Sequence, residues 1–197
     1  MKELLRSILI FVVMSLLTGL AYPFIITGIS NIAMPQKAQG SLIISKDKVI
    51  GSALIGQHFS NARYFHGRPS ALEKPYDASN SGGSNFGPSN KKFLDDVSKR
   101  VQQVRNENGL EPTVPIPADM VLASASGLDP HISIETALLQ TARISHARGL
   151  PETEIRKTIA DVAEKQYFGG PEIVNVLKLN RAMDELMEKT NYHGGNK

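Results

Sequence analysis

Two serines, one histidine and two aspartates lie close together in one stretch of the chain. Ser124 and Ser126 precede His131; Asp119 comes before all three, and Asp129 lies between Ser126 and His131. A serine that is activated by a histidine, which a carboxylate orients in turn, is the arrangement of a serine hydrolase. The G-x-S-x-G elbow that presents such a serine in many hydrolases is not in the sequence. A membrane-tethered hydrolase is therefore an alternative hypothesis, and we assign no catalytic residue.

The Asp129-Pro130-His131 triplet could instead orient an imidazole or bind a metal ion. Zinc sites take three or four protein ligands, and the sequence offers no third ligand near this pair. Helix capping explains Asp129, and a local hydrogen bond explains His131. We therefore predict no metal site.

Arg68 stands beside Pro69 in a stretch rich in aromatic residues. Its planar guanidinium could bind a carboxylate of a partner protein. It could equally pair with Asp77 in the same loop, and the sequence leaves both possibilities open.

No motif of an ion pump or channel is present. The glycine-rich run from Gly82 to Gly87 is followed by Pro88, whereas a phosphate-binding loop continues with lysine and serine or threonine. Neither the D-K-T-G motif of P-type ATPases nor a T-V-G-Y-G selectivity filter occurs. The sequence thus predicts a chain that is not an enzyme by itself and forms no pore.

The elements that position these residues are predicted to form an α+β domain. Residues 42–50 read as a β-hairpin around a polar turn, and 119–125 as a buried strand. About four helices follow: one after an N-cap at Ser89, one from Pro130 to Arg148, one from Pro151 to Gly169-Gly170, and one from about Asn175. Residues 63–90 form a loop, which is either an ordered recognition loop, our preference, or a flexible linker.

The stretch Ile8–Met34 is predicted to span a membrane. No residue between Arg6 and Lys37 is charged, and a span needs about 20 apolar residues. A signal peptide has an apolar core of only about 7–15 residues and a small-residue cleavage site, and neither feature fits. We predict an uncleaved single-pass anchor in residues 1–34, an exported domain in 35–190 and a frayed tail in 191–197.

Lys2 and Arg6 precede the span, so the N-terminus is expected in the cytoplasm and the folded domain outside. Within the span, the small residues Ser15 and Gly19, together with Tyr22, are candidates for packing against another membrane helix. Pro23 either kinks the helix or marks its outer end.

The formal net charge of +3 argues against a nucleic-acid surface, which would show a basic stripe. The chain has no cysteine, so disulfides and thiolate metal sites are excluded.

Several blocks in a fixed order resemble one known family, the C subunit of the bacterial Kdp potassium-transporting ATPase. A single N-terminal span comes first. The blocks that follow it are Gly51–Gln57, Phe65–Ala71, Ser79–Asn85, Pro117–Val121, Ser126–Ser133, Ala147–Leu150 and Val174–Leu177.

This resemblance implies an accessory subunit in the bacterial inner membrane that is needed for assembly and activity of the pump. Its implied partners are a channel-like, potassium-binding A subunit, an ATP-hydrolysing P-type B subunit and, in many cases, a small F subunit. It also implies a catalytic chaperone that raises the ATP affinity of the B subunit. ATP is thus a cofactor only through the complex. The predicted orientation places the domain away from cytoplasmic ATP, so the effect would have to pass through the helix.

Within these blocks and the loop, we take eight residues as candidates for partner or ligand contact: Gln57, Arg68, Asp77, Asn80, Ser84, Asn85, Asp129 and His131. An exported solute-binding module remains a further alternative.

Overall fold

The computed structural model describes residues 1–166 and 169–194. The chain divides into two compact units, Met1–Ser52 and Ala53–Lys197. The predicted α+β class is confirmed, because each unit combines helices with a two-stranded sheet.

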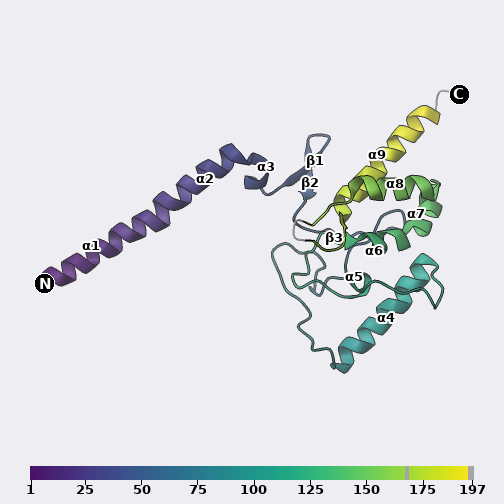
Figure 1. The fold of residues 1–197 in the computed structure, drawn as a ribbon, viewed down its shortest axis with the longest axis horizontal. Coiled ribbons are helices and arrows are strands. Elements are labelled where there is room, and N and C mark those ends of the chain that lie inside the picture. The colour runs from purple at the N-terminus through teal and green to yellow at the C-terminus, as the bar shows by residue number, and fades with distance from the viewer. Residues whose placement is uncertain (167–168, 195–197) are drawn as a thin grey trace. The chain divides into compact units, whose positions relative to one another are not determined.

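The first unit begins with one long apolar helix (Figure 1). It consists of α1 (Lys2–Leu16), the π-helical turn η1 (Leu17–Ala21) and α2 (Tyr22–Ala33), and it contains no buried residue. Lys2–Ala33 is long and apolar enough to cross a membrane. The predicted apolar helix is therefore present, although it begins at Lys2 rather than at Ile8.

Pro23 explains the π-helical turn. A proline in a helix lacks the amide donor, and its ring crowds the carbonyl four residues earlier, here that of Gly19. Gly19 lies inside η1, where the wider turn relieves this crowding. The helix continues to Ala33, so Pro23 does not mark its end.

The predicted hairpin is confirmed. After the short helix α3 (Pro35–Ala38), strands β1 (Leu42–Ser45) and β2 (Lys48–Ser52) pair antiparallel. Lys46 and Asp47 both have positive φ, 47° and 61°, as a type I′ turn requires. The register shifts between Ile43 and Ile44, which produces a bulge.

The second unit contains six helices and one small sheet among its described residues. The helices are α4 (Lys91–Asn108), α5 (Ala118–Val121), α6 (Ile134–Leu139), α7 (Thr141–Arg148), α8 (Glu152–Val162) and α9 (Val176–Gly194). Strands β3 (His131–Ser133) and β4 (Ile173–Asn175) pair antiparallel. The pairing joins segments that are far apart in the chain, and the sequence analysis missed this sheet.

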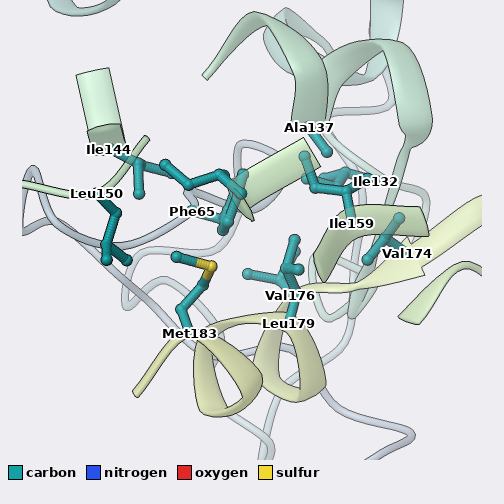
Figure 2. Packing of buried hydrophobic residues seen from close by; sticks show 11 residues of the cluster. Phe65, Ile132, Ala137, Ile144, Leu150, Ile159, Val174, Val176, Leu179 and Met183 are labelled. Carbon is teal, nitrogen blue, oxygen red and sulfur yellow. The ribbon is translucent and has the colours of Figure 1, made fainter. Parts of the chain in front are cut away.

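One apolar cluster holds this unit together (Figure 2). Ile155 and Ile159 of α8, and Leu179 and Met183 of α9, contribute side chains at helical spacing, as predicted. Phe65 comes from the long loop and is completely buried in the same cluster. The loop is therefore part of the core, which supports an ordered segment over a flexible linker.

The predicted strand at Asp119–Ala125 is wrong. The residues form the short helix α5 and a turn. The Asp119 carboxylate accepts hydrogen bonds from the Ser133 backbone N–H at 2.6 Å and from the Thr136 hydroxyl at 2.8 Å. This contact with the start of α6, which local sequence does not reveal, determines the backbone path.

Several predicted helix boundaries also change. Asn90, not Ser89, caps α4, because its side chain accepts from the Phe93 N–H at 3.1 Å. Pro130 does not open a helix; β3 follows it, and Ser133 caps α6.

The predicted helix from Pro130 to Arg148 is divided at Gln140, and α8 ends at Val162, before the predicted Gly169-Gly170. The expected ends at Gly109 and Gly149 are confirmed, both with positive φ. In the predicted tail, α9 continues to Gly194, and residues 195–197 lie outside the described residues.

Candidate functional site

The long loop is held by buried amide side chains from two helical segments. The N–H of Phe65 donates to Asn180 Oδ1 at 2.7 Å, and Asn180 Nδ2 donates to the Phe65 carbonyl at 3.0 Å. Gln140 binds the next residue, His66, in the same way. The His66 N–H donates to Gln140 Oε1 at 2.8 Å, and Gln140 Nε2 donates to the His66 carbonyl at 3.1 Å. Two consecutive loop residues are thus paired as if each faced a β-strand.

Two arginines of α7 bind the residues just before this point. Arg143 donates to the carbonyls of Ala62 and Tyr64, the latter at 3.0 Å, and to Gln140 Oε1 at 2.7 Å. The Arg148 side chain is fully buried, donates to the Arg63 carbonyl at 2.6 Å and lies 2.9 Å from an Asp184 oxygen. The backbone carbonyls of this part of the loop are thus bound by arginine side chains and not by a neighbouring strand.

Arg68 and Asp129 form the ion pair of the site. Arg68 Nη1 lies 3.0 Å from Asp129 Oδ2, and both side chains are about three-quarters buried. The other terminal nitrogen donates to the carbonyls of Leu122 and Ala123, at 3.4 and 3.3 Å. Among the described residues, Arg68 Nε is buried without a hydrogen-bond partner.

The suggested pairing of Arg68 with Asp77 is wrong. The Asp77 carboxylate binds the backbone N–H and the hydroxyl of Ser79, at 3.0 and 2.7 Å, and so closes a local turn. Asp129 pairs with Arg68 because the fold brings the 122–131 segment beside the loop.

Tyr76 lies next to Arg68, and its ring and hydroxyl fill the space that side chains at two glycine positions would occupy. Its hydroxyl donates to the Arg68 carbonyl at 2.6 Å. A Cβ on Gly56 would lie 2.3 Å from the ring, and one on Gly67 would lie 2.6 Å from the hydroxyl oxygen. Glycine at these two positions is therefore required by the close approach of Tyr76.

A cavity of about 330 Å³ opens beside the loop. Arg68 and Arg100 line it together with His58, His66 and Glu107. Asp129 already neutralises the Arg68 guanidinium, which leaves Arg100 and Glu107 as opposite charges of the lining. The described residues contain no cluster of three potential metal ligands.

Three ionisable groups of the site have shifted pKa values. Burial, and next the charge of Arg143, lower the pKa of His66. Burial, and next the charge of Asp129, raise the pKa of Tyr76 to about 12. Burial would raise the pKa of Asp129, but hydrogen bonds from His131 and Arg68 outweigh it and lower that pKa.

Of the predicted contact residues, the structure brings together Arg68, Asp129 and His131. His131 donates its backbone N–H to Asp129 Oδ1 at 3.0 Å, and its ring Nδ1 lies 3.6 Å from the same oxygen. Gln57 is half-buried, whereas Asn80, Ser84 and Asn85 are exposed. Asp77 lies in the turn described above. A role of these residues in partner contact stays a prediction.

The hydrolase alternative finds no support in the contacts of its residues. Ser124 Oγ accepts from the Gly127 N–H at 2.9 Å, and Ser126 Oγ accepts from the Leu128 N–H at 3.2 Å. Both hydroxyls thus stabilise a turn, and Asp119 binds Ser133 and Thr136 instead of His131.

The sequence analysis missed the residues that hold the loop. Asn180, Arg143 and Arg148 are polar residues on helices, and Gln140 lies between two helices; Gln140 and Asn180 are almost completely buried. One signal was available: Asn180 directly follows Leu179 on the inward face of α9, where an apolar residue would be expected.

In the apolar helix, Ser15, Gly19 and Tyr22 are exposed. Nothing lies within 4 Å of a Cβ added at Gly19. Its role in helix packing stays a prediction.

Comparison with known proteins identifies the family. A family model described as KdpC, the c chain of the K⁺-transporting ATPase, matches residues 4–185. The potassium-transporting ATPase KdpC subunit of Rhodopseudomonas palustris (strain TIE-1) is 45% identical over 198 residues, which cover 93% of this chain and 97% of the relative. The KdpC subunit of Photorhabdus laumondii is 45% identical, and the match covers 93% of this chain and 96% of the relative. The KdpC subunit of Bradyrhizobium diazoefficiens is 43% identical, and the match covers 96% of this chain and 100% of the relative. The matches span both units, from the apolar helix to α9, and the chain therefore belongs to the KdpC family.

Proposed function

We propose that this chain is the accessory subunit of an ATP-driven potassium uptake pump in the bacterial inner membrane. The family carries this proposal, since relatives with about 45% identity over nearly their whole length are potassium-transporting ATPase KdpC subunits. The structure supports it with an apolar helix that has no buried residue and a folded unit in which the buried amides of Asn180 and Gln140 hold a loop. The subunit neither passes the ion nor carries the phosphorylated aspartate.

In this proposal the apolar helix packs in the membrane against a channel-like A subunit. The ATP-hydrolysing B subunit and a small F subunit complete the pump. The surface that includes Ser15, Gly19 and Tyr22 is the candidate helix contact. Purification through a tag on this chain tests the assembly: the large subunits should co-purify, and recovery of this chain alone would contradict the proposal.

The N-terminus lies in the cytoplasm and the folded unit outside. The chain has no cysteine, so single introduced cysteines report their side of the membrane. Asn106→Cys, on an exposed position of α4, should react with a membrane-impermeant maleimide in intact spheroplasts. Glu3→Cys, before Arg6 at the other end of the apolar helix, should react only after permeabilisation. The reverse pattern would reject this orientation.

The catalytic chaperone effect is an indirect one. The subunit raises the ATP affinity of the B subunit through the membrane helices, as a coupling between distant sites. The pump should therefore require a higher ATP concentration without this chain, while the purified chain alone should bind no ATP. Binding of ATP to the chain alone would replace this indirect coupling by direct nucleotide contact, and the cavity beside Arg68 and Arg100 would be the place to look.

A further inference from the structure

The hairpin of β1 and β2 presents one apolar face. Ile44 pairs with Val49 across the strands, and Leu42 lies two residues before Ile44, so the three side chains share that face. They are 49% (Leu42), 55% (Ile44) and 59% (Val49) exposed. Neighbouring apolar side chains that remain this exposed mark a contact surface.

The charges that flank the apolar helix locate the hairpin relative to a bilayer. The stretch Ser7–Gln36, between Arg6 and Lys37, has no charged residue. Its helical part, Ser7–Ala33, is about 40 Å long. A bilayer measures about 40–45 Å from one headgroup layer to the other. When Arg6 lies in one headgroup layer, the helix thus ends at Ala33 in the other, and Lys37 follows four residues later in α3.

The link between Lys37 and the hairpin folds back instead of extending. The Gly40 N–H donates to the Lys37 carbonyl at 3.0 Å, and the Ser41 N–H donates to the Gln36 carbonyl at 2.8 Å. Gly40 has a φ of +86°, which ends the short helix α3. Leu42, the first residue of the apolar face, comes directly after this turn and therefore lies close to the level of Lys37.

We infer that the hairpin is a second membrane contact, with Leu42, Ile44 and Val49 lying between the headgroups and the acyl chains. Interfacial segments bury an apolar face to a depth of about 5–10 Å in this way. Lys46 lies in the turn of the hairpin, where a lysine side chain reaches anionic headgroups. The inference depends on membrane anchoring and not on the identity of the pump subunits.

The chain contains no tryptophan, so a single introduced tryptophan reports its own surroundings. Full-length Val49→Trp is reconstituted into phosphatidylcholine–phosphatidylglycerol vesicles whose acyl chains carry bromine either near the headgroup or near the chain end. Ser45→Trp is the matched control, because Ser45 lies in β1 on the opposite face from Ile44. Phe24→Trp in α2 is the reference for a deep position.

The fluorescence of Val49→Trp should shift to shorter wavelength and be quenched most by the bromine near the headgroup. Ser45→Trp should be quenched weakly by both lipids, and Phe24→Trp most by the deeper bromine. Equal quenching of Val49→Trp and Ser45→Trp, or quenching of neither, would overturn the inference. Leu42→Trp repeats the test on the same face if Val49→Trp does not fold.

A protein partner is the competing occupant of this face. If Val49→Trp shifts only when the large pump subunits are reconstituted with the chain, the face binds protein and the lipid contact is rejected. Co-purification of those subunits is measured separately, so failure of this inference leaves the proposed function intact.

Discussion

The side-chain amide of Asn180 forms both hydrogen bonds of the Phe65 peptide groups, although the two residues are 115 positions apart. Asn180 is 2% exposed, and Phe65 is completely buried. Water cannot replace either bond at such a site. The pair therefore joins the long loop to α9 through two buried hydrogen bonds.

Replacement of Asn180 by Leu should destabilise the folded unit. It leaves a buried N–H and a buried carbonyl without partners, and each such group costs about 1–3 kcal/mol. We expect a loss of about 2–6 kcal/mol in the free energy of unfolding. Urea unfolding of the full chain in detergent, followed by tyrosine fluorescence, measures it. Asn106→Leu, on an exposed position of α4, is the control, and an equal effect of both changes would contradict the role of Asn180.

Gly67 and Tyr76 should show coupled effects. Gly67→Ala places a Cβ 2.6 Å from the Tyr76 hydroxyl oxygen and 3.5 Å from the ring carbon that carries it. Tyr76→Phe removes that oxygen and with it the clash, at the cost of the bond to the Arg68 carbonyl, about 1–2 kcal/mol.

The double variant should thus be more stable than the sum of the two single changes, by about 0.5–3 kcal/mol. Thermal unfolding of the four proteins in this cycle gives the coupling. Simple additivity would show that the hydroxyl is not what excludes a side chain at position 67. Gly56→Ala is the matched control, because its Cβ meets the ring carbon Cε1 and Tyr76→Phe should not rescue it.

The stability of the folded unit should depend on the protonation of His66. Its pKa is lower in the folded state than the ordinary value of 6.5, so the unfolded state binds the proton more readily. Stability is fully present above about pH 6.5 and falls as the pH drops through the folded-state pKa.

His66→Gln should reduce this loss of stability, measured as the urea midpoint between pH 7 and pH 5. His146→Gln, on an exposed position of α7, should leave the pH dependence as it is in the natural chain. A pH dependence that is identical in His66→Gln and the natural chain would assign the effect to other groups.

Asp129→Asn should weaken the loop through the loss of the Arg68 ion pair. Both side chains are mostly buried, and a hydrogen bond to a charged group contributes about 1.5–3 kcal/mol. We expect a destabilisation of this size, measured by urea unfolding at pH 7. Asp77→Asn removes an equal charge in the same loop and should have a clearly smaller effect. A larger destabilisation by Asp77→Asn than by Asp129→Asn would instead indicate Asp77 as the partner of Arg68.

The effect of Asp129 should also disappear at low pH. The pKa of its carboxyl is lowered in the folded state, so its contribution is present above the ordinary value and is lost as the pH falls through the folded-state pKa. The natural chain and Asp129→Asn should therefore approach equal stability in acid. A difference that persists after protonation would point to the shape of the side chain and not to its charge.

The sequence by itself determined the features that depend on neighbouring residues. An uncharged apolar stretch is recognisable because membrane crossing requires length and composition only. The hairpin predicted at 42–50 and the helix ends at Gly109 and Gly149 follow from polar and glycine residues at their turns. The blocks that carry the family resemblance are likewise visible in the chain without any fold.

The tertiary structure decided which distant groups meet. Arg68 pairs with Asp129 instead of the nearer Asp77, the stretch at Asp119 is helical because its carboxylate binds the start of α6, and β3 finds its partner in β4. Each outcome depends on contacts between segments far apart in the chain, and the periodicity of side chains carries no information about them. Gln140 and Asn180 hold the loop for the same reason: burial, which only the fold creates, makes their amides the available partners of its backbone.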